Sequence, residues 1–415
     1  MPASEAPPLQ PQPLYSPIDS STNTIRLLEI QRCQDGGIEG SLTHCALSNP
    51  TPNYIALSYA WGDAESPRET IRINGVTVQI RENLRHALDS IISVRDAVND
   101  GPARLWIDSI CIDQSNTAEK NHQVQQMSNI YSTATTVVSW LGLHTPESAI
   151  FFQWGMQQSS VRRGENWRHT LSLGPTLSLR PTLSKAVEEL LSRNYWKRLW
   201  IVQEVLLALD HQIMCGTDCV AGDDFFNRWI TAPGGVPLHG PPGEFQWFDK
   251  TVEPPGYRLL REKCSGYGDI YDFQSLYRLF CAFHRQECMN PLDKIFGLLG
   301  IITSYGRESP IAVDYGKTPE QLCFDVLDAV RSDLRHESPS DAGWFAFSLL
   351  KALQLYEDDS DEFGTGSKSS ITERVDGYLE NLGKDRPPTW DGDGWQDGKT
   401  GRATDTISIK RGYLL

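Results

Sequence analysis

LWIDSICIDQSNTAEKNHQVQQMSNIYSTATTVVSWLG, residues 105–142, is the stretch that decides the fold. An apolar run is followed by a polar loop, an amphipathic stripe and a β-branched run, which predicts strand, loop, helix and strand. Strand, helix and strand in so short a stretch predict a parallel βαβ unit. The first strand is followed by Asp108, Cys111 and Asp113. Because open α/β sheets place their ligands beyond the carboxyl ends of the strands, the segment also predicts the edge where chemistry occurs.

The regions beside this stretch extend the same pattern. Residues 54–61, YIALSYAW, predict a strand that ends in a turn. Residues 70–80, TIRINGVTVQI, alternate around Asn-Gly, which predicts a hairpin. Residues 83–94 carry apolar side chains at helical spacing, and so do residues 185–209.

The composition favours an acidic protein without a membrane span. Lys and Arg number 38 against 53 Asp and Glu, so the formal net charge is −15. That balance argues against a general nucleic-acid binder, because phosphate contacts need a basic face. We expect no transmembrane helix, because no apolar run approaches the length of about 20 residues that spanning requires. An odd count of 9 cysteines and no signal-like N-terminus favour reduced thiols in an intracellular, cytoplasmic protein.

The length of 415 residues favours more than one domain. The composition shifts along the chain predict four regions. These are a disordered Pro-rich leader at 1–22, an α/β domain at 23–210 with an insertion at 142–183, a mostly helical region at 211–355 and an acidic, largely disordered tail at 356–415. Within the helical region, residues 273–283 and 319–330 are the clearest helices.

Several common catalytic motifs are absent from the sequence. GKT occurs at 316–318 and at 398–400, but the glycine that a phosphate loop requires five residues earlier is replaced by Ile311 and Asp393. No GxGxxG follows a strand, and neither HExxH nor GxSxG occurs. These absences remove support for nucleotide-binding, zinc-protease and lipase classes.

The cysteines do not predict a metal site. Cys281, His284 and Cys288 have helix-like spacing, but no second pair of the zinc-finger type accompanies them. We therefore expect no metal and interpret these thiols as buried or half-buried. Cys111 follows a strand and is a candidate nucleophile, but no histidine base is placed beside it by the sequence.

Three blocks combine aromatic and charged residues at the expected ends of elements. They are SYAWGD at 58–63, LWIDSICIDQ at 105–114 and RNYWKRLWIVQE at 193–204. In a structural interpretation, Trp61, Trp106, Trp196 and Trp200 anchor the core, and Arg193 or Arg198 neutralises Asp108 or Glu204. In a functional interpretation, the acids and aromatic rings meet in one cleft, where a ring stacks on a base and a carboxylate binds ribose hydroxyls or stabilises a cation.

These blocks resemble the three signature blocks of the fungal heterokaryon incompatibility (HET) domain family. YIALSYAWGD, the stretch quoted above and YWKRLWIVQEV occur in the family's order over residues 53–205. NPLDKIFGLLGI and IAVDYGKTPEQL resemble the region that follows this domain, which extends the resemblance to about residue 330. Asp113 stands where asparagine is frequent in the family, and residues 142–183 form an insertion of variable type.

The resemblance implies a role in self/non-self recognition between fusing hyphae, with signalling toward programmed cell death. It implies protein partners, such as an incompatibility or immune-receptor-like protein, and it allows a homo-oligomer. An alternative is a relative that does not kill, or an accessory protein of a metabolite gene cluster.

HET domains are also similar, at a distance, to TIR domains. This similarity implies a TIR-like (flavodoxin-like) parallel sheet flanked by helices, followed by a mostly helical C-terminal region. Some TIR domains cleave NAD, and the matching glutamate here is Glu204, after Trp200. In that alternative NAD is the substrate rather than a bound cofactor, Glu204 is catalytic, and Trp61, Asp63 and Asp108 shape the pocket. Whether the chain is an enzyme stays open at this point, because fold analogy alone does not license an activity.

Overall fold

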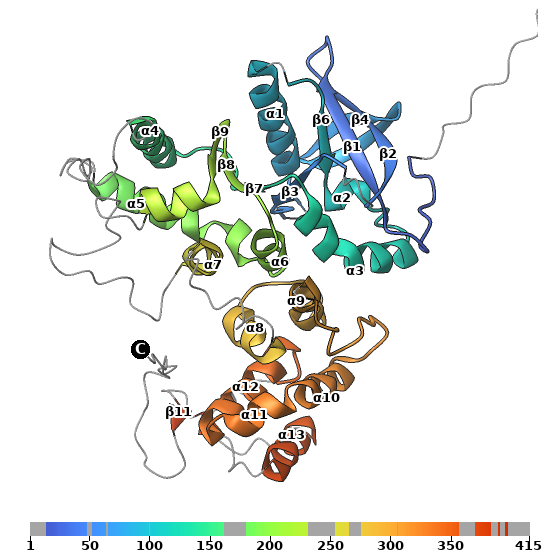
Figure 1. Cartoon of the computed structure of the whole chain (residues 1–415), viewed down its shortest axis with the longest axis vertical. Helices are drawn as coiled ribbons and strands as arrows, with labels where there is room; N and C mark the ends of the chain where they lie inside the picture. The colour runs from blue at the N-terminus through green and yellow to red at the C-terminus, as the bar shows by residue number, and fades with distance from the viewer. Residues whose placement is uncertain are drawn as a thin grey trace, which may run out of the picture. The chain divides into compact units, whose positions relative to one another are not determined.

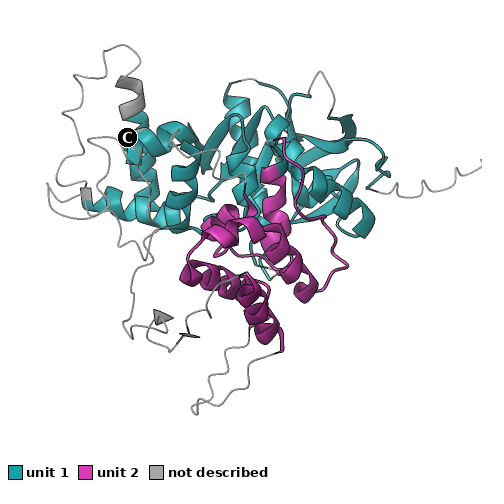
Figure 2. Cartoon of the chain, turned by 60° about the horizontal axis from the view of Figure 1, so that its bottom comes forward, with its two compact units in different colours: residues 1–270, 303–305 teal, residues 271–302, 306–415 magenta. Residues whose placement is uncertain are grey.

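The structure, a computed structural model, divides the chain into two compact units. The first contains residues 1–270 and 303–305, and the second contains residues 271–302 and 306–415 (Figure 2). The described residues are 14–47, 52–63, 65–98, 100–161, 180–230, 254–264, 275–304, 306–356, 370–382, 389–390 and 395–396.

A nine-stranded mixed sheet organises the first unit (Figure 1). Its spatial order is β5-β4-β2-β1-β6-β3-β7-β8-β9. The strands are β1 Thr24–Arg32, β2 Ile38–Ala46, β3 Ile55–Tyr59, β4 Arg68–Ile73, β5 Val76–Arg81, β6 Ala103–Trp106, β7 Thr136–Trp140, β8 His211–Cys215 and β9 Asp218–Ala221. The predicted α/β fold is confirmed. Strands β8 and β9 continue the sheet past residue 210, where the sequence suggested a domain boundary.

The centre of the sheet is parallel and its edges are not. Strand β3 pairs in parallel with β6 and β7, and β7 pairs in parallel with β8. Numbered along the chain, these four strands lie in the order 2-1-3-4, the start of the flavodoxin-like doubly wound order. The sheet is mixed rather than parallel throughout. The pairs β1–β2, β4–β5 and β8–β9 are hairpins, whose short turns enforce antiparallel pairing, and β1 also pairs with β6 in the antiparallel direction.

The hairpin predicted from Asn-Gly is confirmed. Asn74 and Gly75 join β4 to β5, and both have positive φ (51° and 78°), as the favoured two-residue hairpin turn requires. The neighbouring β1–β2 hairpin turns at Gly36, which also has positive φ (82°).

Helices lie in the connections β5–β6, β6–β7 and β7–β8, and η2 and α7 follow the last strand of the sheet. In the first unit they are α1 Glu82–Ala97, α2 Asp108–Cys111, α3 Thr117–Thr133, α4 Pro146–Val161, α5 Arg180–Ser192, η1 Asn194–Lys197, α6 Ile201–Leu206, η2 Asp224–Ile230 and α7 Pro255–Cys264. The side chain of Asn116 caps α3 by accepting the backbone N–H of Glu119 (3.1 Å). Of the insertion expected at 142–183, α4 and the start of α5 are described, whereas residues 162–179 lie outside the described part of the chain.

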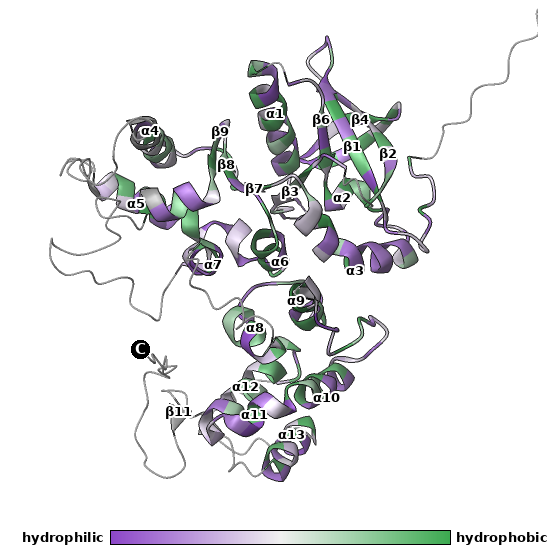
Figure 3. Cartoon of the chain, in the orientation of Figure 1, coloured by the Kyte–Doolittle hydropathy of each residue, from purple (hydrophilic) through white to green (hydrophobic). Residues whose placement is uncertain are grey.

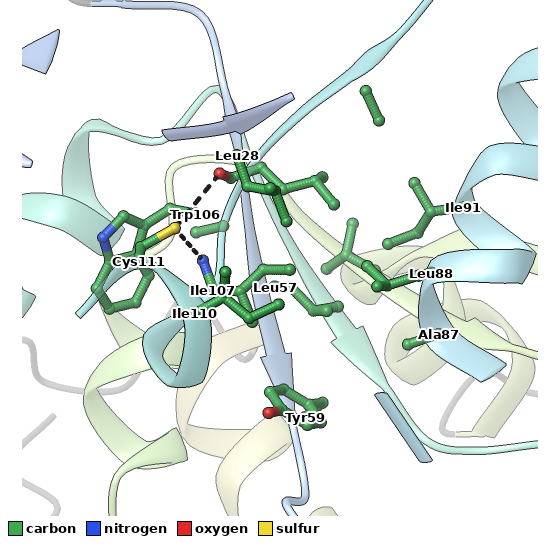
Figure 4. Close-up of a cluster of buried hydrophobic side chains, with 14 of the residues drawn as sticks. Leu28, Leu57, Tyr59, Ala87, Leu88, Ile91, Trp106, Ile107, Ile110 and Cys111 are labelled. Carbon is green, nitrogen blue, oxygen red and sulfur yellow. Dashed lines mark hydrogen bonds between the residues drawn. The ribbon is translucent and has the colours of Figure 1, made fainter. Parts of the chain in front are cut away.

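The apolar stripe of α1 packs against the sheet, as the periodicity predicted. Its buried residues include Ala87, Leu88 and Ile91, and Figure 4 shows them beside Leu28 and Leu57. Helix α1 carries hydrophobic and hydrophilic residues around its circumference (Figure 3), which is typical of a helix on one face of a sheet.

Cys111 belongs to this core rather than to a reactive site. It is fully buried, and its sulfur accepts the backbone N–H of Ile107 (3.4 Å) (Figure 4). Burial raises the pKa of the thiol to about 12. Since the thiolate is the nucleophile, a thiol held in this protonated state is unreactive.

Part of the expected leader, residues 14–22, is described, whereas residues 1–13 lie outside the described part of the chain. The Tyr15 hydroxyl donates to the carbonyl of Ile110 (3.1 Å), and Arg26 donates to the carbonyl of Ser16 (2.6 Å). The segment before β1 is therefore held against α2 and against the Arg26 side chain of β1.

The second unit is mainly helical. Its elements are α8 Leu276–Phe283, α9 Asp293–Ser304 (of which residues 303–304 group with the first unit), α10 Pro319–Ala329, α11 Arg331–His336, α12 Pro339–Ala352, α13 Ser370–Asn381, β10 Thr389–Trp390 and β11 Trp395–Gln396. Thr318 and Gln321 form a capping box before α10, and Lys317 pairs with Asp325 (2.6 Å). The first GKT sequence is thus a helix start, while residues 357–369 and most of the expected tail lie outside the described residues.

Candidate functional site

The three sequence blocks meet at the carboxyl ends of the parallel strands. Block 58–63 ends β3 and continues beyond it, block 105–114 contains the end of β6, and block 193–204 supplies η1 and α6. The strand order reverses beside β3, since β6 lies on one side and β7 on the other. Such a switch point is where doubly wound folds bind their ligands. Acids and aromatic rings from the three blocks therefore lie together, an arrangement that is compatible with the structural and the functional interpretation alike.

Glu204 lies at the centre of this site. It is 2% exposed, the Ser58 hydroxyl donates to its Oε2, and Tyr131 forms a second hydrogen bond with it. The pKa of Glu204 is raised to about 7, mainly by burial; Arg198 opposes this shift, and the charge of Asp108 adds to it. The carboxyl group therefore changes its charge near neutral pH.

Asp108 is the second carboxylate of the site. Both of its oxygens accept the Trp61 indole N–H (2.9 and 3.1 Å), and Oδ1 also accepts the backbone N–H of Ser109 (2.7 Å). Burial raises the pKa of Asp108, while Arg198 and these hydrogen bonds lower it in part. Trp61 and Asp108, two of the three residues expected to shape a pocket, are thus in direct contact.

Arg198 is the cation that balances the two acids. Burial lowers its pKa, but the charges of Glu204 and Asp108 outweigh this effect, and the pKa is raised overall. Arg198 also donates to the carbonyl of Tyr59 at the end of β3. Of the two arginines that the structural interpretation proposed, Arg193 instead pairs with Glu189 (2.8 Å).

The loop after β3 is fixed through its backbone. Besides the Arg198 bond, the Asn83 amide donates to the carbonyl of Ala60 (2.6 Å), and Arg81 donates to that of Gly62 (3.1 Å). The Asn83 side-chain oxygen accepts the indole N–H of Trp140 (3.0 Å), which ties the loop to the end of β7. The apolar spacing of residues 83–94 predicted a helix that includes Asn83 but did not predict this role; the position of Asn83 in the first turn after a hairpin was the available signal.

Asp63, the third expected pocket residue, stands apart from this cluster. Its side chain is exposed, and its backbone carbonyl accepts the N–H of Ser66 (3.1 Å). Gly62, with a φ of +77°, turns the chain just before it. The structure therefore brings Glu204, Asp108 and Trp61 together, whereas Asp63 points to solvent.

The tryptophans of the blocks divide between core and rim. Trp106 and Trp196 are fully buried, as the structural interpretation expected, whereas Trp61 and Trp200 are half-buried. The Arg81 guanidinium lies 5.8 Å from the ring centroid of Trp61. The rim thus presents aromatic and cationic groups beside the buried acids.

A chain of buried hydroxyl groups, which the sequence analysis missed, extends the site across the sheet. Ser58 lies 2.7 Å from the Tyr195 hydroxyl, which donates to Ser139 (2.6 Å); Ser139 lies 2.7 Å from Nε2 of His211. Among the described residues, no three His, Cys, Asp or Glu side chains are grouped as metal ligands would be. In the same part of the chain, no helix has both the length and the apolar character needed to cross a bilayer.

Comparisons with known proteins cover the three blocks that form this site. Residues 54–204 match the family model described as heterokaryon incompatibility protein (HET). Heterokaryon incompatibility protein 6, OR allele, of Neurospora crassa is 30% identical over 317 residues, which is 66% of this chain and 43% of that protein. This chain therefore spans less than half the length of that relative. No solved structure gives a significant match.

Proposed function

Because the chain is a member of the heterokaryon incompatibility (HET) family, we propose that it acts in fungal incompatibility, signalling toward programmed cell death. In this role it recognises self and non-self through protein contacts. Its partners are an incompatibility or immune-receptor-like protein and, where it oligomerises, further copies of itself.

The observation that supports this proposal is the burial of the charged side chains in the site. Glu204 is almost fully buried and is bonded to Ser58 and Tyr131, so the carboxyl group holds α6 against β3 and α3. Buried charges of this kind specify one arrangement of the elements around them. The half-buried rim, with Trp61 and Arg81, is then the part of the site available to a partner.

Expression in a filamentous fungus tests this role. Induced production of the full chain is expected to arrest hyphal growth and to admit a vital dye, and Arg198→Met is expected to abolish both effects, because it leaves two buried acids without their cation. The full chain is needed, since a fragment ending at residue 210 would lack β8 and β9.

Arg104→Met is the matched control. Arg104 pairs with Glu29 at 3.7 Å on the surface, and both side chains are about half exposed (48% and 46%), so its loss should leave growth arrest unchanged. Normal growth of the wild-type strain at protein levels equal to those of the control strain would contradict the signalling role.

An NAD glycohydrolase that uses Glu204 is the second candidate. The observation that favours it is a pair of buried carboxyl groups with raised pKa values, Glu204 and Asp108, at a topological switch point. In this candidate Glu204 stabilises the oxocarbenium ion as nicotinamide leaves, and the site must open to admit NAD.

Nicotinamide release from NAD separates the two candidates. For the signalling role we expect no release by the purified wild type above that of Glu204→Gln. For the enzyme, the substitution should lower the rate by about 100-fold or more, while Glu188→Gln on the exposed side of α5 leaves it unchanged.

A further inference from the structure

The hydroxyl chain beside Glu204 has two titratable ends. Glu204 accepts from Ser58, and the contacts then pass through Tyr195 and Ser139 to Nε2 of His211. These five side chains come from α6, β3, η1, β7 and β8, and none is more than 6% exposed. Because water is excluded from them, each polar atom relies on its neighbour in the chain.

The sheet register explains why the hydroxyls line up. Ser58 and Ser139 are direct neighbours on the parallel strands β3 and β7, so their side chains lie on the same face. Strand β8 follows on the other side of β7 and begins with His211 (Figure 1). Tyr195, from η1, bridges the two serines.

The number of protons limits how this chain is bonded. It has four links, and each link needs one proton, but Ser58, Tyr195 and Ser139 supply only three. The fourth proton comes from one end, either from the carboxyl group of Glu204 or from Nε2 of His211. All four links are made in only two arrangements, and in these the hydroxyls point in opposite directions.

We propose that this hydroxyl chain couples the protonation of Glu204 to the tautomer of His211. When Glu204 is ionised, every hydroxyl points toward it, and His211 carries its proton on Nε2. When Glu204 is protonated, the chain reverses, Ser139 donates to Nε2, and His211 carries its proton on Nδ1. The chain is thus a pH-sensitive relay across the sheet, and the proposal holds for either candidate function.

The charges around both ends permit this exchange. Glu204 faces Arg198, Asp108 on α2, Tyr131 on α3 and Tyr195 on η1. Burial and, to a smaller extent, the charge of Lys263 on α7 together lower the pKa of His211 to about 3. The imidazole therefore stays neutral over the range in which Glu204 titrates, so its tautomer rather than its charge responds.

The two arrangements differ in free energy because Nδ1 of His211 has no hydrogen-bond partner. Nδ1 has no hydrogen-bond partner, and Gly222 lies so close that a Cβ there would be 2.4 Å from it. With Glu204 protonated, Nδ1 carries a hydrogen that has no acceptor, which is costly in a buried position. With Glu204 ionised, only a lone pair is left unpaired.

Nuclear magnetic resonance of the full chain, labelled with 15N-histidine, tests the relay. Long-range proton–nitrogen spectra are recorded from pH 5 to pH 9, and His211 is assigned by its loss in His211→Gln. We expect the Nδ1–H form to dominate below pH 6 and the Nε2–H form above pH 8. Glu204→Gln should remove this pH dependence.

Two variants break the chain at different points. Tyr195→Phe removes the middle hydroxyl, and Ser58→Ala removes the link to Glu204, so each should make the tautomer independent of pH while His211 stays neutral. If one variant does not fold, the other carries the test. A tautomer that stays the same in the wild type across this range, or one that still inverts in a folded Tyr195→Phe or Ser58→Ala variant, overturns the proposal.

Discussion

As the pH rises from 5 to 8, the free energy of unfolding of Glu204→Gln is expected to increase by about 2–3 kcal/mol relative to that of the wild type. The pKa of Glu204 is raised from 4.5 to about 7 in the folded protein. Between these values the folded state binds more protons than the unfolded state, so the stability that the protonated group contributes is present at low pH and is lost as the pH passes 7. Glutamine does not titrate, and it avoids that loss.

Urea unfolding of both proteins at several pH values measures this difference. Glu188→Gln serves as the control, because Glu188 is exposed on α5, and its free energy of unfolding should follow that of the wild type at every pH. A stability difference between Glu204→Gln and the wild type that is the same at pH 5 and pH 8 would mean that Glu204 is ionised throughout, and the relay to His211 would then have no trigger in this range.

The large features of the fold follow from local sequence patterns. Asn74-Gly75 specifies a hairpin by itself, and the stripe of α1 specifies which side faces the sheet. The position of Asp108 was also predictable, because strand ends of a parallel sheet share one edge, whereas Glu204 comes from helix α6. Local patterns were insufficient for Asp63, because the turn at Gly62 decides which way its side chain points.

The hydroxyl chain was not predictable for a different reason. Ser139 and His211 are polar residues in short strands, and a sequence pattern does not show that each buried group has a partner 72 positions away. Such pairs depend on strand order, which became known only with the structure. The antiparallel pairing of β1 with β6 has the same origin, because these two strands are far apart in the sequence, whereas the hairpins follow from local turns.

Arg26→Met is expected to destabilise the protein by about 3–5 kcal/mol, the range for removing one partner of a buried ion pair. Arg26 on β1 is 1% exposed, and its guanidinium contacts both carboxylate oxygens of Glu119 at 2.5 and 2.9 Å. It also donates to the carbonyls of Cys111 and Ser16. Methionine keeps much of the length of the side chain but leaves the Glu119 charge buried without its cation.

Arg32→Met on the same strand provides the comparison that isolates burial. Arg32 pairs with Asp89 at 3.0 Å, but the two side chains are 34% and 32% exposed, so its loss should cost less than about 1 kcal/mol. Adding Glu119→Leu to Arg26→Met should recover only part of the stability, because it removes the unpaired charge but also removes the acceptor of the Asp113 N–H (2.8 Å). If Arg26→Met and Arg32→Met lowered the free energy of urea unfolding equally, the Arg26–Glu119 pair would contribute no more to stability than a surface ion pair. The segment before β1 would then be held mainly by Tyr15 and its bond to Ile110.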